Sequence, residues 1–292
     1  MNSRFSAAIR GGLSFRSVSQ ATFAEDIDVS NNTVTSWVTD KTLPNKRSMP
    51  LVQTYFEWSD AKLLMLLEDW HLNVRSEKAC HIAGTDFVTW KYGGDYVRFL
   101  EELIALDQET IDGAVGEHEG TPDQWAPIFK NNPDTWKLLV KGDKVVGYWQ
   151  FHCLKREAYD LVVNGDITDA DITLDMVTYP EIAGNYFAHL PVITTRKEIR
   201  GIRTIKLIID SLCASIRQFA SDDVYFESFA AVAFTDQGKQ LCERLGLRYK
   251  IDHPRTNISG ISKIYEINGI DVPASYFGRD PLIREKYIKA FQ

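Results

Sequence analysis

A cluster of positive charge around a glycine is the first feature of the chain that could do chemistry. The segment 196–206 carries five cationic side chains, and Gly201 lies inside it, just before a long predicted helix. The first turn of a helix has unpaired backbone N–H groups and partial positive charge, and a glycine lets a ligand come close to them. This arrangement predicts a pyrophosphate site. The cations are Arg196, Lys197, Arg200, Arg203 and Lys206.

Strands and helices alternate from about residue 80 onward, which predicts a mixed α/β domain. Two apolar runs flank Gly142-Asp143, an order typical of a β-hairpin. A helix over 236–245 is expected to end at Gly246, a natural C-terminal cap. The hairpin runs are 136–140 and 145–151; other strands are expected over 81–92, 185–194, 224–232, 248–251 and 261–267, helices over 96–111 and 202–219, and a loop or short helix over 120–133.

Three segments of this α/β region resemble the GNAT acetyltransferase superfamily, over roughly residues 80 to 270. The hairpin KLLVKGDKVVGYWQF, with Gly147, is similar to the second and third strands of that family. The segment PVITTRKEIRGIRTIKLII is similar to its strand, phosphate loop and helix. The segment AFTDQGKQLCERLGL is similar to its last helix.

The resemblance implies that acetyl-CoA is the co-substrate and that no metal takes part. The strand before the loop would support the pantetheine arm and polarise the thioester, and the loop would bind the pyrophosphate. Two residues depart from the family's loop, Glu198 and Arg203; Arg203 would either clash with the pyrophosphate or pair with it. The residues implied are Val192, Ile193, Thr194, Arg200, Gly201, Ile202, Arg203 and Thr204.

The resemblance also implies candidate catalytic residues. Cys242 occupies the place where many family members have a tyrosine that protonates the leaving thiolate; packing is its alternative role. The acceptor amine must lose a proton, and His189 and Asp175 are the candidate bases. For His189 the alternative is a hydrogen-bonded core or rim histidine, and for Asp169, Asp171 and Asp175 it is a solvated loop. The acidic stretch from Asp166 to Glu181 would attract an amine such as a polyamine, an aminoglycoside or a lysine side chain.

The first fifty residues predict a different kind of unit. Apolar residues at helical spacing before and after Asp28-Val29 predict two short helices with a tight turn, and Ser30 is a good N-cap for the second. Asp28 occupies the turn position usually given to glycine, and aspartate tolerates the left-handed backbone that such a turn requires.

This stretch resembles the Cro/phage-repressor (XRE-like) helix-turn-helix family over about residues 1 to 58, through Ala24, Ile27, Val29, Val34 and Trp37. The resemblance implies that the second helix enters the major groove of double-stranded DNA. Asparagine pairs with adenine and threonine contacts thymine methyl groups. The residues expected at bases are Asn31, Asn32, Thr33, Thr35 and Ser36, and those expected at phosphates are Lys41, Lys46 and Arg47.

The chain is therefore expected to have two domains, an all-α helix-turn-helix bundle followed by a mixed α/β GNAT-like domain. The expected ranges are 1–75, including a connecting helix over 60–74, then 76–270, and a C-terminal extension over 271–292. The connecting helix is strongly apolar on one face, which suits a packed core or the seam of a homodimer.

Composition narrows the class of protein. The chain of 292 residues is 44% hydrophobic and 25% charged, which is ordinary for a globular protein. Its net charge of −7 conceals a contrast, because residues 1–50 carry six Lys/Arg against four acids. No apolar run reaches the length of a membrane span, the N-terminus does not resemble a signal peptide, and the four cysteines are dispersed. A cytoplasmic protein is expected.

The leading functional hypothesis is acetyl transfer from acetyl-CoA to an amine, in a protein that also binds DNA and regulates transcription. The alternative is a catalytically degenerate regulator that senses CoA thioesters. A third is an interaction bundle without a DNA target, such as the neutralising partner of a toxin.

Overall fold

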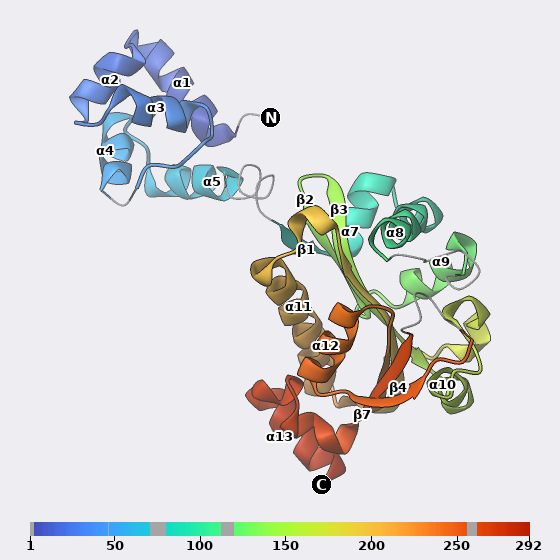
Figure 1. Cartoon of the computed structure of the whole chain (residues 1–292). Helices are drawn as coiled ribbons and strands as arrows, with labels where there is room; N and C mark the ends of the chain where they lie inside the picture. The colour runs from blue at the N-terminus through green and yellow to red at the C-terminus, as the bar shows by residue number, and fades with distance from the viewer. Residues whose placement is uncertain (1–2, 46, 71–79, 112–119, 256–261) are drawn as a thin grey trace. The chain divides into compact units, whose positions relative to one another are not determined.

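The chain folds into two units, residues 1–80 and 81–292. The structure, a computed structural model, describes residues 3–45, 47–70, 80–111, 120–255 and 262–292 (Figure 1). The expected boundary between 75 and 76, the end of the connecting helix at 71–74 and Lys46 lie outside the described residues.

Helices are the only regular secondary structure among the described residues of the N-terminal unit. Serine side chains begin three of them by accepting a hydrogen bond from a first-turn N–H, which has no partner within the helix. The helices are α1 (Arg4–Arg16), α2 (Gln20–Asp26), α3 (Asn31–Val38), α4 (Ser48–Tyr55) and α5 (Asp60–Trp70).

A four-residue turn, Ile27–Ser30, joins α2 to α3. Asp28 has φ 54°, so the predicted left-handed aspartate is confirmed, and the N–H of Val29 donates to the carbonyl of Ala24 at 2.9 Å. Ala24 is buried between the two helices, and the side chains of Phe23 and Trp37 belong to the same apolar core.

The large unit is built on one seven-stranded sheet with the order β1-β2-β3-β4-β5-β7-β6. Only β4 and β5 are parallel neighbours; every other pair is antiparallel. A mixed α/β domain is thus confirmed. The strands are β1 (His81–Ala83), β2 (Trp136–Lys141), β3 (Lys144–Leu154), β4 (Gly184–Thr195), β5 (Val224–Ala233), β6 (Arg248–Asp252) and β7 (Lys263–Asn268).

Helices cover both faces of this sheet (Figure 1). On one face, α8 and α9 pack their aromatic and aliphatic side chains on β2 and β3 around Phe99, Phe129 and Trp136. On the other, α11 places Phe219 against Phe151 of β3. The helices are α7 (Thr85–Tyr92), α8 (Tyr96–Thr110), α9 (Pro122–Asn131), α10 (Arg156–Val163), α11 (Ile202–Ser221), α12 (Asp236–Leu245) and α13 (Pro281–Phe291), with short 3-10 helices η2 (Asp169–Asp171), η3 (Leu174–Met176), η4 (Lys197–Ile199), η6 (Gly269–Ala274) and η7 (Phe277–Arg279).

The prediction of a strand over 81–92 is wrong for most of its length. The strand ends at Ala83, and Thr85–Tyr92 is helical. Phe87, Val88 and Tyr92 are buried, which places them on one helical face instead of alternating between two faces of a strand. The predicted hairpin and the cap at Gly246, which has φ 99°, are confirmed.

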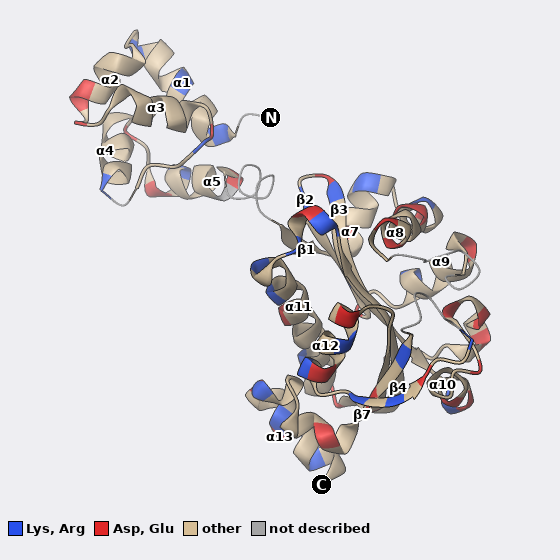
Figure 2. Ribbon diagram, in the orientation of Figure 1, with Lys and Arg blue, Asp and Glu red and all other residues tan. Residues whose placement is uncertain are grey.

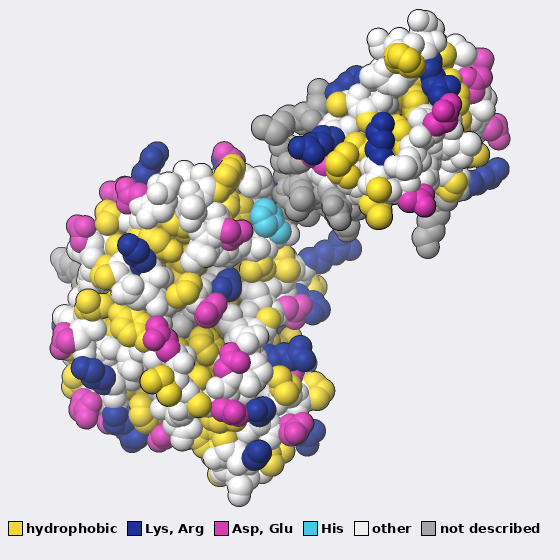
Figure 3. All heavy atoms as spheres, turned by 180° about the vertical axis from the view of Figure 1, so that it is seen from behind, with side chains coloured by type: hydrophobic (Ala, Val, Ile, Leu, Met, Phe, Trp, Pro, Cys, Tyr) yellow, Lys and Arg dark blue, Asp and Glu magenta, His cyan; other side chains and the backbone are white. Residues whose placement is uncertain are grey.

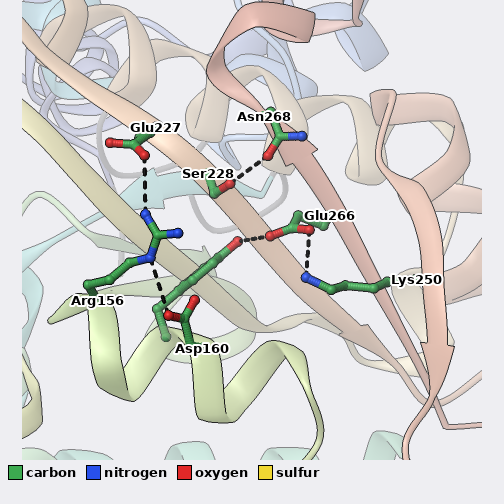
Figure 4. Close-up of polar contacts among 8 residues, drawn as sticks. Arg156, Asp160, Glu227, Ser228, Lys250, Glu266 and Asn268 are labelled. Atoms are coloured by element: carbon green, nitrogen blue, oxygen red, sulfur yellow. Dashed lines mark hydrogen bonds and ion pairs between the residues drawn. The ribbon is translucent and has the colours of Figure 1, made fainter.

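Polar contacts tie α10 to the late strands (Figure 4). The hydroxyl of Tyr159 donates to Glu266 at 2.8 Å, and Lys250 pairs with the same carboxylate at 2.9 Å. Ser228 donates to Asn268 at 2.7 Å between β5 and β7. Burial raises the pKa of Tyr159, so it remains a neutral donor. These contacts fasten the β5-β7-β6 half of the sheet to α10.

Candidate functional site

The parallel strands β4 and β5 separate before they end. Their pairing runs from Gly184 opposite Val224 to Leu190 opposite Ala231, although β4 continues to Thr195. The next residue, Pro191, has no N–H to donate to a neighbouring strand. Along its other edge, β4 pairs with β3. There the step from Gln150 to His152 covers two residues of β3, whereas the facing step from Val192 back to His189 covers three residues of β4. The extra residue is a β-bulge, which bends β4 at this point.

Beyond the bulge, backbone groups of β4 face the opening. The N–H of Arg196 donates to Val146 of β3, whereas the carbonyl of Thr195 accepts from the Arg200 side chain at 3.0 Å. Because successive residues of a strand direct their backbone groups to opposite sides, the N–H of Ile193 also faces away from β3, into the separation from β5. A backbone donor is thus available where the strands divide.

Close packing of β3 holds β4 in this position. A Cβ on Gly147 would lie 2.6 Å from the carbonyl oxygen of Thr194, so only glycine fits there. Thr194 also shares a hydrogen bond of 2.7 Å with Thr110 at the end of α8. The strand end is therefore fixed from two sides.

A pocket of about 70 Å³ lies beside the bulge, between α8, α9, β3 and β4. Its lining includes Pro191 and Val192 of the bulge and Phe234, which follows β5. Most of the wall is apolar, from Leu103 and Ile104 of α8 and Trp125 and Phe129 of α9. The polar lining residues are Asp107, Tyr148, Gln150 and Asp169, and the hydroxyl of Tyr148 donates to Asp107.

Asp169 and His189 form a pair at the pocket. Nε2 of His189 lies 2.8 Å from Oδ1 of Asp169, and since an ionised carboxylate only accepts, Nε2 carries the proton. The imidazole is 1% exposed and the carboxylate 21% exposed. The carboxylate lines the pocket, whereas the pocket lining does not include the histidine. Asp169 is therefore the member of the pair that a ligand would meet.

The segment that carries Asp169 is held by two side chains. Gln124, in the first turn of α9, donates to the carbonyl of Ile172 at 2.6 Å. Arg255 pairs with Asp171 at 2.8 Å, and Asp171 accepts from the N–H of Thr168 at 2.8 Å. The hydrogen bond from Thr168, with Arg255 nearby, lowers the pKa of Asp171.

His152 lies opposite His189 on the paired strand. Its ring stacks on Trp125 with centroids 4.7 Å apart, and neither ring nitrogen has a hydrogen-bond partner among the described residues. Burial, together with His189, lowers the pKa of His152 to about 3. A neutral imidazole therefore supports the indole that lines the pocket.

The predicted phosphate loop is exposed at the start of α11. Ile202 is 90% exposed, a Cβ on Gly201 would meet no atom within 4 Å, and no side chain caps the helix. Arg203 is exposed and makes no ion pair or hydrogen bond with the described residues, while Thr204 donates to Ile199 at 2.8 Å. Figure 2 shows Lys and Arg at this helix start. An anion would find free backbone donors and a free guanidinium here.

Other cations of the segment 196–206 are already engaged, among them Lys206, which pairs with Asp210 at 2.5 Å. Arg200 donates to the carbonyls of Thr195 and Thr110, at 3.0 and 3.2 Å, and Arg196 pairs with Glu109. These contacts join the loop to the ends of β4 and α8. The side chain of Arg200 is thus placed to hold the loop, and its backbone remains beside Gly201.

The three predicted catalytic residues do not meet. Only His189 lies beside the pocket, in contact with Asp169. Asp175 is exposed in η3 and accepts from Thr173 at 2.5 Å, which lowers its pKa. Cys242 is 7% exposed on α12, outside the pocket lining, and burial raises its pKa to about 12.

The sequence alone does not identify Gln150, Tyr148 and Asp107 as pocket residues. One signal was present: Tyr148, Gln150 and His152 alternate along a strand that is otherwise apolar. Alternation places these side chains on one face of the sheet. A row of polar groups on a buried face indicates a site, because buried polar side chains need partners.

The N-terminal unit presents most of its predicted DNA-binding residues to solvent. Asn31, Asn32 and Thr35 are exposed at α3, and Thr33 and Ser36 are half-buried. Lys41 and Arg47 are exposed, and their side chains make no ion pair with the described residues. On the face in view in Figure 3, basic side chains of this unit stand apart from one another.

No protein-family model matches the chain, and no curated protein matches it significantly. Among solved structures, it is similar to Arabidopsis thaliana Naa50 in complex with a bisubstrate analogue, at 12% identity and a TM-score of 0.39, covering 65% of this chain and 98% of that one. It is also similar to an acetyltransferase from Thermus thermophilus, at 12% identity and TM-score 0.37, covering 65% and 97%. A third is the loading GNATL domain of CurA from Lyngbya majuscula, at 12% identity and TM-score 0.40, covering 65% and 98%.

Those TM-scores are low, so the description of the fold rests on the strand order and register given above. Within the described ranges, no group of three or more His, Cys, Asp or Glu side chains is arranged to hold a metal ion. Among the same residues, no helix has both the length and the apolar character needed to cross a membrane.

Proposed function

We propose that the unit 81–292 is an N-acyltransferase that moves an acetyl group from acetyl-CoA to an amine. The observation that carries the proposal is the separation of β4 from β5 at Pro191, directly beside a pocket with two carboxylates. Acetyl-CoA is a substrate that supplies an activated thioester, and an extended arm fits between two strands whose backbone groups are unpaired.

Residues at the start of α11 would bind the pyrophosphate of this substrate. The exposed first turn after Gly201 offers backbone N–H groups, and Arg203 offers a guanidinium without a competing partner. Because Arg203 is exposed and unpaired, it would contact a phosphate oxygen and need not obstruct one. Val192, Ile193 and Thr194 would lie along the arm.

The N–H of Ile193 would stabilise the negative charge that develops on the thioester oxygen. Asp169 would accept a proton from the ammonium form of the acceptor, and His189 would hold the carboxylate in place. The new N–C bond forms as the C–S bond breaks, and one of the two protons left on the amine nitrogen ends on the thiolate sulfur. The balanced products are the amide, the free thiol and one proton.

Calorimetric titration with acetyl-CoA, followed by an assay of thiol release over a panel of amines, tests this proposal. Micromolar binding with amine-dependent thiol release supports it. Absence of both removes it. Binding without turnover for any amine would instead favour the second candidate, a regulator that senses CoA thioesters, in which the unpaired Arg203 would serve binding alone.

We also propose that the N-terminal unit binds double-stranded DNA through α3 and thereby contributes to transcriptional regulation. The exposed side chains of Asn31, Asn32 and Thr35 at the start of α3 support this proposal, because they suit base edges in a major groove. Lys41 and Arg47 would contact phosphates. A selection from random duplexes at low salt, with bound DNA sequenced, tests it; recovery of no preferred sequence would remove sequence-specific binding.

A further inference from the structure

The pocket beside the β4 bulge has an apolar wall and four polar lining residues, together the polar corner. Trp125 and Phe129 of α9 and Leu103 of α8 form the wall, and Val192 closes it at the bulge. Asp107, Tyr148, Gln150 and Asp169 form the corner, and no Lys, Arg or His is part of the described lining. A ligand for this pocket has one polar end and one apolar end.

The carboxylates of the polar corner favour a positively charged ligand. Two of its four polar residues are carboxylates, and Asp169 retains acceptor capacity beyond the one bond from His189. A pocket with apolar walls strengthens the attraction between such carboxylates and a cation, because water does not screen it fully.

Gln150 independently indicates a hydrogen-bond donor as the ligand. Its side chain is 8% exposed, and its Oε1 has no hydrogen-bond partner among the described residues. A buried carbonyl oxygen without a partner is unfavourable until a donor reaches it. An ammonium group supplies three N–H donors, enough for this oxygen and for carboxylates on either side.

We propose that the acceptor is a small primary amine on a short apolar body. Its ammonium group is bound by Gln150 and by the carboxylates of Asp107 and Asp169, and its body packs on Trp125 and Phe129. This inference rests on the proposed acyl transfer and gives it a substrate class. A diamine or an aminoglycoside is disfavoured because its further charges would lie against the apolar wall.

Three probes of similar length test the inference on the full chain: 3-methylbutylamine, 3-methylbutanol and putrescine. Binding is measured by calorimetry with and without free coenzyme A, and turnover by thiol release from acetyl-CoA. We expect 3-methylbutylamine to bind at least about ten-fold more tightly than either of the others, with the lowest KM of the amines. Equal binding of the alcohol, or preference for putrescine, overturns the inference.

A pair of variants assigns the binding to the polar corner. Gln150→Leu nearly keeps the size of the side chain but removes the amide oxygen. We expect this variant to bind 3-methylbutylamine about ten-fold more weakly. Gln240→Leu makes the same change on an exposed position of α12 and should leave the affinity unchanged. A circular dichroism spectrum and a thermal unfolding midpoint close to those of the unchanged chain show that the Gln150→Leu variant is folded. An unchanged amine affinity in that folded variant overturns the inference.

These outcomes separate the two proposals. If amines are acetylated but 3-methylbutylamine is not preferred over putrescine, the acyltransferase proposal stands and the substrate class is wrong. If 3-methylbutylamine binds in a Gln150-dependent manner but acetyl-CoA does not bind, the pocket inference stands as a binding site and the proposed acyl transfer fails.

Discussion

His189 donates from Nε2 to Oδ1 of Asp169 at 2.8 Å, from a buried strand to a carboxylate at the pocket wall. Twenty residues separate the two along the chain, and the bend at the bulge lies immediately after the histidine. In the acyl transfer that we propose, this order of groups makes Asp169 the base and His189 a positioning residue.

Replacement of Asp169 by Asn should lower kcat by about 100-fold or more, because a positioned base contributes a factor of that order. Acetyl-CoA affinity should stay unchanged. Steady-state thiol release with a primary amine measures the effect. Asp175→Asn, at an exposed position away from the pocket lining, is the matched control and should retain activity. Equal losses in both variants would contradict the role of Asp169.

Replacement of Gly201 by Val should weaken acetyl-CoA binding by at least about ten-fold while the protein stays folded. The added side chain would meet no protein atom within 4 Å of its Cβ, and Gly201 has φ −176°, an extended backbone that valine adopts without strain. The new methyl groups would instead occupy the approach to the helix start. Calorimetry and the thermal unfolding midpoint measure the two effects; unchanged affinity would mean that the phosphate site lies elsewhere.

The low pKa of His152 predicts a loss of stability in acid. The pKa is about 3 in the folded chain, well below the ordinary value of 6.5, so below pH 6.5 the unfolded chain binds a proton that the folded chain does not. Between pH 6.5 and pH 5 this one group should lower the free energy of unfolding by about 2 kcal/mol.

Denaturant unfolding at pH 7 and pH 5 measures this change. In a His152→Gln variant the difference between the two pH values should shrink by about 2 kcal/mol, since other groups contribute equally to both proteins. Imidazole resonances give a check that needs no variant: the His152 signal should not titrate between pH 5 and pH 8. A midpoint near 6.5 would show that the ring is accessible to water.

In the DNA proposal, Asn32 and Arg47 should act differently. Asn32→Ala should weaken the binding free energy for the preferred duplex by about 1–3 kcal/mol and change it little for other duplexes, because a contact to a base determines sequence selectivity. Arg47→Ala should weaken all duplexes alike and reduce the salt slope by about one. Arg98→Ala, exposed on α8 in the other unit, serves as control. Equal effects of Asn32→Ala on all duplexes would contradict a base contact.

Local patterns in the sequence were sufficient for much of the α/β fold. The turn at Gly142-Asp143 and the cap at Gly246 depend on backbone geometry that a few residues set, and both were predicted. The helix Thr85–Tyr92 was not, because burial of Phe87 and Tyr92 under α8 overrides a weak alternation.

The candidate site was harder to predict because its partners meet only in three dimensions. The sequence indicates His189 as a candidate base but favours a solvated loop for Asp169, whose position depends on Gln124 and Arg255. Gln150 gave a local signal through its position between Tyr148 and His152. Its unpartnered oxygen depends on the packing of α8 and α9, which no short segment encodes.

Pro191 has a consequence for how fast a ligand enters. A strand pair that could close would compete with any extended guest for the same backbone groups, and each binding event would have to wait for it to open. A residue with no amide hydrogen, placed where the pairing stops, removes one rung of that competing ladder permanently. In the acyl transfer that we propose, the crevice would therefore be preorganised, and association would be limited by encounter and not by a preceding rearrangement of the sheet.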